Sequence, residues 1–470
     1  MKTRITGYLG VALILFSAAC KVSKNVKLPD MQLQNTYRSA KATDSSGIAK
    51  LPFKSFFADL TLQEMIDSAI ARNNDLQIAI KNIEAARLQY AQSKLGNIPS
   101  VGLALTASSS RPSDNSLNGL SLSQFLGSKH IEDYTAAANV SWEADIWSKI
   151  KSRKAAALAS YLQTEEARKA VQTEVVAAVS KGYYNLLMLD AQLTIAKKNV
   201  ALNDSTLRII KLQYTAGQAT SLAVQQADAQ RLAAAKLIPQ FEQEVFIQEN
   251  ALSILSGKLP ENVARNKKLD DIEVATTLSA GFPSDLLSLR PDVRSAELDV
   301  DRANAEVGFS KARMYPSLTI TAQGGVNAFK ASNWFNLPAS LFGTIAGGLT
   351  QPLFQRKELK TGYEIAKVQR ERSVIQFRQQ VLVAVGEVSD ALVRMDKLDE
   401  QQVIARQRAK TLQVATGNAS MLFKNGLANY LEVITAQSNV LQSELELASI
   451  KKAQLDATID LYRSVGGGWR

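Results

Sequence analysis

The sequence predicts an internally duplicated fold of mixed α and β structure, in which long antiparallel coiled-coil helices accompany four strands. Two stretches of about 65 residues space their apolar residues by three and four, as coiled-coil helices do. Four shorter segments alternate apolar and polar residues, which is typical of strands. Similar segments recur at offsets of 209 and 217 residues, which indicates two copies of one plan.

The first residues have the features of a secretory signal. Lys2 and Arg4 precede a short apolar run and a small-residue cleavage site, so residues 1–19 are the predicted signal peptide. The next residue, Cys20, is the only cysteine of the protein, and its place resembles that of the lipidated cysteine in bacterial lipoproteins. We therefore expect a covalent lipid on Cys20 and a lipidated extension over residues 20–59. An ordinary secreted protein with a free thiol is the alternative.

The charge pattern argues against nucleic-acid binding. The net charge of +11 falls to +9 when Lys2 and Arg4 leave with the signal peptide, and the remaining cations are spread along the chain. Binding to nucleic acid would need a clustered basic patch or a recognisable module. No other stretch of about 18 apolar residues follows the signal, so a bilayer could be crossed only by strands.

The duplication sets the domain boundaries. The segment 214–227 recurs as 423–436, and Asn74-Asp75-Leu76 corresponds to Pro291-Asp292-Val293. These correspondences predict a first repeat over residues 60–260, a linker over 261–283 and a second repeat over 284–470.

Each repeat begins with a predicted helix. In the first repeat it runs from Leu62 to Leu95, with Thr61 as N-cap and Glu64 at the capping-box position. In the second repeat it runs from Pro291 to Met314, because proline suits a first helical turn.

Strands are expected after both helices. Val101, Leu103 and Leu105 alternate with smaller or polar residues, and the second repeat shows the same alternation from Leu318 to Ala322. The returning strands, near 134–143 and 342–353, are rich in Gly, Ala and Thr and carry a weaker signal.

The predicted long helices follow the strands. No proline occurs between Pro112 and Pro239 or after Pro352. A helix of about 65 residues is on the order of 100 Å long, so we expect an elongated molecule. Turns at Gly217 and Gly426 would make these helices antiparallel to the ones that follow.

An enzyme is not expected. The chain has one histidine, His130, and its only thiol is the proposed lipid site. Cys/His metal spacing, a nucleophile elbow and a phosphate-binding glycine loop are all lacking from the sequence. We therefore predict no catalytic residue, no metal site and no cofactor apart from the lipid.

Four motifs together resemble the TolC/OprM-type outer-membrane efflux family, in particular its lipoprotein (NodT-like) branch. The motifs are Arg290–Glu297, Ala312–Ser317, Gln351–Phe354 with its counterpart Ser141–Trp147, and Leu461–Trp469. The resemblance implies a homotrimer in which each chain adds four transmembrane strands to one shared β-barrel, continued by a helical tunnel through the periplasm. It implies a passive conduit of a tripartite efflux system in the outer membrane. Small molecules would reach the conduit from an inner-membrane resistance-nodulation-division pump through a periplasmic adaptor (membrane fusion) protein.

The resemblance also assigns functional residues. Aromatic residues near the strand ends would meet the membrane lipids, with burial in protein as the alternative: Trp142, Trp147, Phe329, Trp334 and Phe335. The helical turns would face the adaptor, unless they only serve as glycine turns: Tyr214, Gly217, Ser221, Phe423, Gly426 and Tyr430. Three copies of Glu432 would form a gating ring of carboxylates that attracts cations, with an exposed helix carboxylate as the alternative. A second ring is not expected, because Thr435 stands where relatives carry aspartate.

Two other functions remain open at this point. A structural lipoprotein tether would explain Cys20 and the heptads but not the duplicated strand pairs. A channel for metal ions or for protein secretion would share every feature described above.

Overall fold

The computed structural model describes residues 22–29, 31, 33–38, 47–274 and 278–470. The predicted signal peptide and Cys20 lie outside the described residues. The chain divides into two compact units, each built from both sequence repeats. The first unit contains Ala85–Tyr161 and Leu298–Val374 with the chain up to Leu28, and the second contains the rest.

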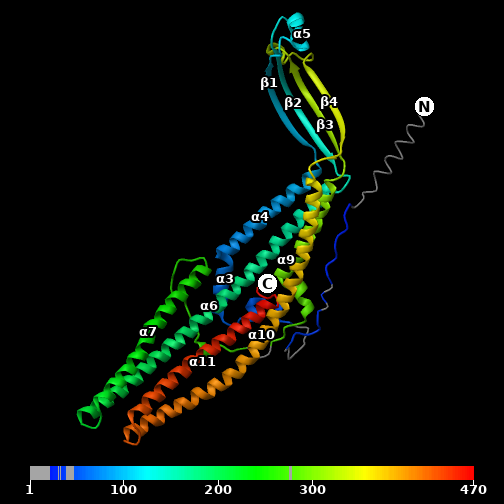
Figure 1. The fold of residues 1–470 in the computed structure, drawn as a ribbon. Helices are drawn as coiled ribbons and strands as arrows, with labels where there is room; N and C mark the ends of the chain where they lie inside the picture. Colours follow the sequence, from blue (N-terminus) through cyan, green and yellow to red (C-terminus); the bar gives the residue numbers. More distant parts are fainter. Residues whose placement is uncertain (1–21, 30, 32, 39–46, 275–277) are drawn as a thin grey trace. The chain divides into compact units, whose positions relative to one another are not determined.

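The first unit holds a four-stranded antiparallel sheet in the order β1-β2-β3-β4 (Figure 1). The strands are β1 (Ser100–Ser110), β2 (Ile131–Ala144), β3 (Ser317–Ala328) and β4 (Leu341–Thr350). The four predicted strands are therefore present. The last one ends at Thr350, before the predicted end at 353, and Pro352 could not have donated a ladder hydrogen bond.

The strand register gives the sheet one apolar and one polar face. Residues paired across antiparallel strands share a face, and neighbouring rows lie on opposite faces. One row joins Val101, Val140, Ala322 and Ile345, and the adjacent row joins Gly102, Asn139, Gln323 and Thr344. The apolar face is open, since Leu103 is 88% exposed and Ile345 is 83% exposed. β2 and β4, whose alternation in the sequence is weak, therefore still have one apolar and one polar face.

The opening helix of the first repeat differs from the prediction in two ways. It consists of α3 (Leu60–Arg72) and α4 (Asn74–Lys94), separated at Asn73. The N-cap of α3 is Asp59, not Thr61, because the Asp59 carboxylate accepts hydrogen bonds from the N–H groups of Thr61 (2.9 Å) and Leu62 (3.3 Å). The break at Asn73 is local, since the Asn73 side chain accepts from Leu76 N–H (3.1 Å) and caps α4.

Two helical hairpins follow the strand pairs (Figure 1). In the first, α6 (Lys149–Thr215) precedes α7 (Ser221–Leu255), and in the second, α10 (Glu358–Lys424) precedes α11 (Tyr430–Ser464). Both first helices have 67 residues and both second helices have 35, so the repeats are equal in length here. Among the described residues, no helix has both the length and the apolar character needed to cross a membrane.

The predicted heptad stripes form the core between these helices. In the second unit, Leu186, Leu189 and Ala196 of α6 pack against Phe241 and Leu252 of α7. On α10, the stripe is buried at five successive predicted positions: Phe377, Val381, Ala384, Val388 and Ala391.

Shorter elements connect the main ones. They are η1 (Ile48–Lys50), α2 (Phe53–Phe56), η2 (Leu95–Asn97), α5 (Leu117–Leu126), η3 (Leu269–Asp271), η4 (Pro283–Asp285), α8 (Leu286–Leu289), α9 (Pro291–Ala312) and η5 (Ala331–Asn333). The α9 helix begins at the predicted Pro291 and ends two residues before the predicted Met314.

Candidate functional site

The two hairpin tips, at the turns α6–α7 and α10–α11, have the same backbone geometry. Gly217 and Gly426 both have φ of +73°, the left-handed conformation that favours glycine at the end of a helix. The N–H of Gly217 donates to Tyr214 O (3.0 Å), and the N–H of Gly426 donates to Phe423 O (3.1 Å). The glycine in each repeat is therefore required by the turn itself.

Side chains from all four helices pack together at the tips. This tip cluster contains Leu207, Ile210, Ala223, Ala227, Phe423, Val433 and Ile434. Of the predicted adaptor-facing residues, Phe423 is buried in the cluster, whereas Tyr214, Gly217, Ser221 and Gly426 are exposed. The latter four residues therefore contribute to the surface of the tip.

One polar contact joins the two hairpins at the tip. The Tyr430 hydroxyl, at the start of α11, donates to the side-chain oxygen of Gln226 on α7 (2.7 Å). Tyr430 is half-buried and Gln226 is exposed. This bond of Tyr430 was not predicted from the sequence, because a contact between two hairpins does not change the local spacing of apolar residues in either.

Glu432 lies in the first turn of α11. The Asn429 side chain caps that turn and accepts from the N–H groups of Leu431 (2.9 Å) and Glu432 (3.2 Å). In the single chain Glu432 and Thr435 are exposed, whereas Val433 packs in the tip cluster. Glu432 is thus on the face of α11 that points away from the chain's own core.

Farther from the tips along the helices, a row of buried amides links α6 to α11. The Asn199 amide donates to Gln437 O (3.0 Å), and the Gln437 amide donates to the Thr206 hydroxyl (2.9 Å). Asn203, one turn along α6, donates to the Asn199 side chain (2.7 Å). Buried amides in a helical seam favour one register, because a shifted pairing leaves them without partners.

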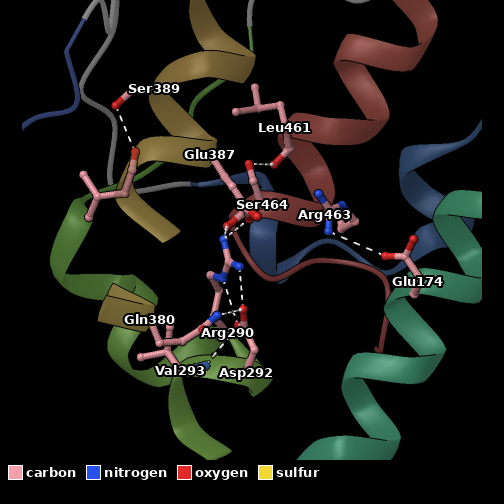
Figure 2. Close-up of polar contacts among 11 residues, drawn as sticks. Glu174, Arg290, Asp292, Val293, Gln380, Glu387, Ser389, Leu461, Arg463 and Ser464 are labelled. Atoms are coloured by element: carbon pink, nitrogen blue, oxygen red, sulfur yellow. Dashed lines mark hydrogen bonds and ion pairs between the residues drawn. The ribbon is translucent and has the colours of Figure 1, made fainter. Parts of the chain in front are cut away.

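A partly enclosed charge cluster surrounds Arg290 (Figure 2). This side chain is 5% exposed and donates through Nε and Nη2 to the Asp292 carboxylate (2.9 and 2.5 Å). Its Nη1 donates to Glu387 on α10 (2.8 Å) and to the backbone oxygen of Ser464 at the end of α11 (3.0 Å). We call these four residues the Arg290 clamp. The clamp joins the start of α9 to α10 and to the C-terminal end of α11.

The clamp changes the acidity of its members. Burial alone would raise the pKa of Asp292, but hydrogen bonds from Arg290, Val293 N–H and the Gln380 amide hold that pKa below its usual range. Burial works to lower the pKa of Arg290, and the carboxylates of Asp292 and Glu387 raise it instead. The contacts of the clamp therefore favour the charged forms of Arg290 and Asp292.

The first repeat contains a neutral counterpart of this clamp. Asn73, 217 residues before Arg290, donates through its amide to Leu255 O (2.9 Å), and Leu255 lies 209 residues before Ser464. Both polar side chains are buried and both satisfy the last carbonyls of a 35-residue helix. The same helix end is fixed by an amide in one repeat and by a guanidinium in the other.

The predicted membrane-interface aromatics lie near the strand ends. The indole N–H groups of Trp142 and Trp147 donate to Asn97 O (2.9 Å) and Pro316 O (2.8 Å), and both rings are half-buried. At the other end of the sheet, Phe329 and Phe335 are exposed, and the Trp334 ring packs against Phe335 (5.1 Å). Both interpretations of these residues, contact with lipid and burial in protein, stay open.

His130 is exposed beside β2. In the parts of the chain that the structure describes, no group of three or more His, Cys, Asp or Glu residues could hold a metal ion.

Comparison with known proteins decides the family. The family model for the outer membrane efflux protein matches residues 65–258 and 282–467. The chain belongs to the outer membrane efflux protein family. Its resemblance to that family, inferred from four motifs, is therefore confirmed.

Individual relatives of this efflux protein match along nearly the whole chain. The probable efflux pump outer membrane protein SepC of Pseudomonas putida is 27% identical over 480 residues, covering 99% of this chain and 97% of SepC. The cation efflux system protein CusC of Escherichia coli is 28% identical over 421 residues, covering 89% of this chain and 88% of CusC. The crystal structure of the open state of the MtrE outer membrane channel of Neisseria gonorrhoeae has the same fold, with a TM-score of 0.84 at 23% identity over 95% of this chain and 98% of MtrE.

These findings establish the general role of the efflux protein. It is an outer-membrane channel with long periplasmic helices and strands of the barrel type. Its family is one of passive outer-membrane efflux channels. The interpretation as an efflux channel is therefore confirmed over the tether.

Proposed function

We propose that the efflux protein is a homotrimeric conduit that carries small toxic molecules out of the cell as the outer-membrane part of a tripartite pump. The observation that carries this proposal is the four-stranded sheet, in which β1 and β4 are edge strands of the single chain. In a lipid environment each unpaired backbone group of an edge costs several kcal/mol, and four strands cannot close on themselves. Pairing β4 of one chain with β1 of the next removes both edges.

The two faces of the sheet favour the same arrangement. The row through Asn139, Gln323 and Thr344 is polar and suits a water-filled lumen, whereas the row through Val140 and Ile345 is apolar and suits lipid. The aromatics near the strand ends would then lie at the two membrane interfaces.

A lipid on Cys20 would hold the N-terminus at the same membrane. Its support is the position of the single cysteine directly after the predicted signal peptide. The lipid would add a second attachment to the membrane beside the barrel.

The hairpin tips are the proposed docking site for the periplasmic adaptor. Leu212, Leu222, Leu427 and Leu431 are exposed there, and an apolar surface in water favours a protein partner. The driving force would come from an inner-membrane resistance-nodulation-division pump. The relatives' names include a toluene efflux pump and a cation efflux system, so the cargo class is open within small molecules.

The proposed gate has two parts. Three copies of Glu432 around the axis would repel one another and attract cations. The bond between Tyr430 and Gln226 would hold the two hairpins of each chain together at the tip, so breaking it would let the tip widen.

Planar-bilayer recording of the mature trimer tests the conduit and the gate separately. We expect Glu432→Gln to lower cation selectivity and Tyr430→Phe to raise conductance, because the first removes the ring charge and the second removes the tie. The control is Glu446→Gln, an exposed carboxylate farther along α11 that pairs with Arg408 (2.6 Å). Wild-type conductance unaffected by either variant would refute the gate and keep the conduit. A lack of conductance in every variant, with no stable trimer on a gel, would refute the conduit.

A further inference from the structure

Positive charge gathers at one end of the sheet. Four junction segments connect strands to helices there: residues 94–99, 143–154, 311–316 and 351–360. Together they carry ten Lys or Arg residues and three acidic residues, a net charge of +7. The segments at the opposite end, 111–133 and 329–340, carry three of each sign and no net charge. Nearly two thirds of the net charge of the protein therefore lies at one rim of the strands.

Several of these cations are exposed and lack an ion-pair partner. Among the described residues no ion pair involves Arg313, Arg356, Lys357 or Lys360, and all four side chains are exposed. By contrast, Lys149 is half-buried and pairs with Glu143 (2.8 Å). A charged side chain held without an opposite charge at a membrane rim attracts anions from that membrane.

Apolar side chains stand directly beside the unpaired cations. Leu353 is 79% exposed and Phe354 is 98% exposed, immediately before Arg356 and Lys357. At the equivalent position of the first repeat, 209 residues earlier, stands Asp145, whose carboxylate accepts from Ile150 N–H (2.8 Å). The second repeat thus has an exposed aromatic ring where the first repeat has an acidic group. An apolar ring next to cations matches the boundary between acyl chains and headgroups.

A cavity at the same level adds polar groups. It is lined by the charged residues Glu143, Asp145, Lys149 and Arg313 and by the rings of Trp147 and Tyr315, which stack at 4.8 Å, and it has a volume of about 240 Å³. Because the two acids balance the two bases, this cavity adds no net positive charge, and the attraction for anions comes from the exposed cations around it.

We propose that these junction segments form a basic collar that binds the anionic headgroups of phospholipids in the leaflet facing the periplasm. The inference rests on the strands spanning the outer membrane, because the junctions then lie at the headgroup level on the side of the helices. It does not depend on the gate or on the pump partner. The collar would fix the depth of the channel in the bilayer and favour phosphatidylglycerol or cardiolipin over neutral lipid.

Lipid retention on the purified trimer tests the collar. The detergent-solubilised channel is mixed with equal amounts of phosphatidylglycerol and phosphatidylcholine of identical acyl chains, and bound lipids are counted by native mass spectrometry. The test variant combines Arg356→Gln, Lys357→Gln and Lys360→Gln. The matched control combines Arg111→Gln, Lys129→Gln and Lys330→Gln, which removes the same charge from the opposite end of the sheet.

We expect the wild type and the control to retain phosphatidylglycerol preferentially. In the test variant the ratio of bound phosphatidylglycerol to bound phosphatidylcholine should fall at least tenfold. Each cation near an anionic surface contributes roughly fivefold at low ionic strength, and the contributions are only partly additive. Equal losses in both variants would mean a non-specific charge effect, and no preference in the wild type would overturn the proposal outright. Release of phosphatidylglycerol by millimolar inorganic phosphate would indicate a small-anion site and overturn it as well. If the triple variant does not form trimers, Lys360→Gln alone should still lower the preference about fivefold.

Discussion

Replacing Arg290 with methionine should release the C-terminal end of α11 without unfolding the channel. Arg290 is the only side chain of the Arg290 clamp that contacts all three others, since it binds Asp292, Glu387 and the backbone oxygen of Ser464. Methionine keeps the length of the aliphatic stem and removes the charge and every donor.

The expected cost follows from the burial of the clamp. Removing one partner of a buried ion pair typically costs about 3–5 kcal/mol, because the remaining charge is left without compensation. Asp292 and Glu387 are each 33% exposed, so water partly solvates them and the lower end of the range applies. About 3 kcal/mol corresponds to roughly a hundredfold rise in the local opening equilibrium.

Hydrogen exchange on the assembled trimer measures this opening. Peptides from residues 286–294 and 461–470 should exchange about a hundredfold faster in Arg290→Met, and peptides from the tips should be unchanged. The control is Arg463→Met, which breaks the looser pair with Glu174 (3.5 Å, side chains 34% and 68% exposed) shown in Figure 2. A surface pair of this kind contributes about 0–1 kcal/mol, so exchange should rise less than about fivefold. A change below threefold in Arg290→Met, or equal changes in both variants, would refute the role of the clamp.

Two further predictions concern glycines and the pH response of the clamp. Gly466→Ala should accelerate hydrogen exchange of residues 461–470, because Gly466 has φ of +94° and an added Cβ would lie 2.6 Å from Leu289 O. Gly417→Ala, inside α10 with open space around it, should slow exchange of its own turn about fivefold. Slower exchange in Gly466→Ala and faster exchange in Gly417→Ala would contradict these two expectations. Asp292→Asn should destabilise the clamp most above about pH 4. The lowered pKa of Asp292 makes its ionised form a stabilising group above the unfolded pKa, and that contribution is lost as pH falls through the folded value. Urea midpoints compared between wild type and Asp292→Asn from pH 7 to pH 3 check this, and a difference that stays constant over the whole range would disprove it.

Periodicity predicted the fold because it reflects which side of an element is buried. The heptad stripes of α6 and α10 follow from one apolar seam, and the alternation of β1 follows from one exposed apolar face. Where side chains on that face are small, as at Ala138, which pairs with Leu103, and at Gly343 in the same row of the sheet, the pattern is weak although the strand is regular. The register of the sheet, and not the sequence of each strand, identifies the face.

Contacts between distant segments could not be predicted in this way. The N-cap at Asp59 is a local contact, and it was not predicted because several residues of that segment could have capped the helix. The Asn73 amide, by contrast, donates to Leu255 O, 182 positions away in the sequence. The pairing of Tyr430 with Gln226 joins residues 204 positions apart. Such long-range contacts form only when the helices pack together, so the local sequence pattern does not reveal them.

The two repeats agree in backbone conformation more closely than in the chemistry of their side chains. Equivalent positions of the two repeats share a conformation, as Gly217 and Gly426 do at the tips, because turn geometry tolerates few residues. Equivalent polar side chains can differ in charge, since Asn73 is neutral where Arg290 is charged. At the junction between sheet and helices, Phe354 of the second repeat likewise stands where the first repeat has the carboxylate of Asp145. Arg290 also binds two carboxylates, whereas Asn73 donates to Leu255 O alone, so we expect the charged version to hold its helix end more strongly. Exchange measured for Asn73→Ala beside Arg290→Met would test this. An equal loss in both repeats would mean that the charge adds nothing to the hydrogen bond.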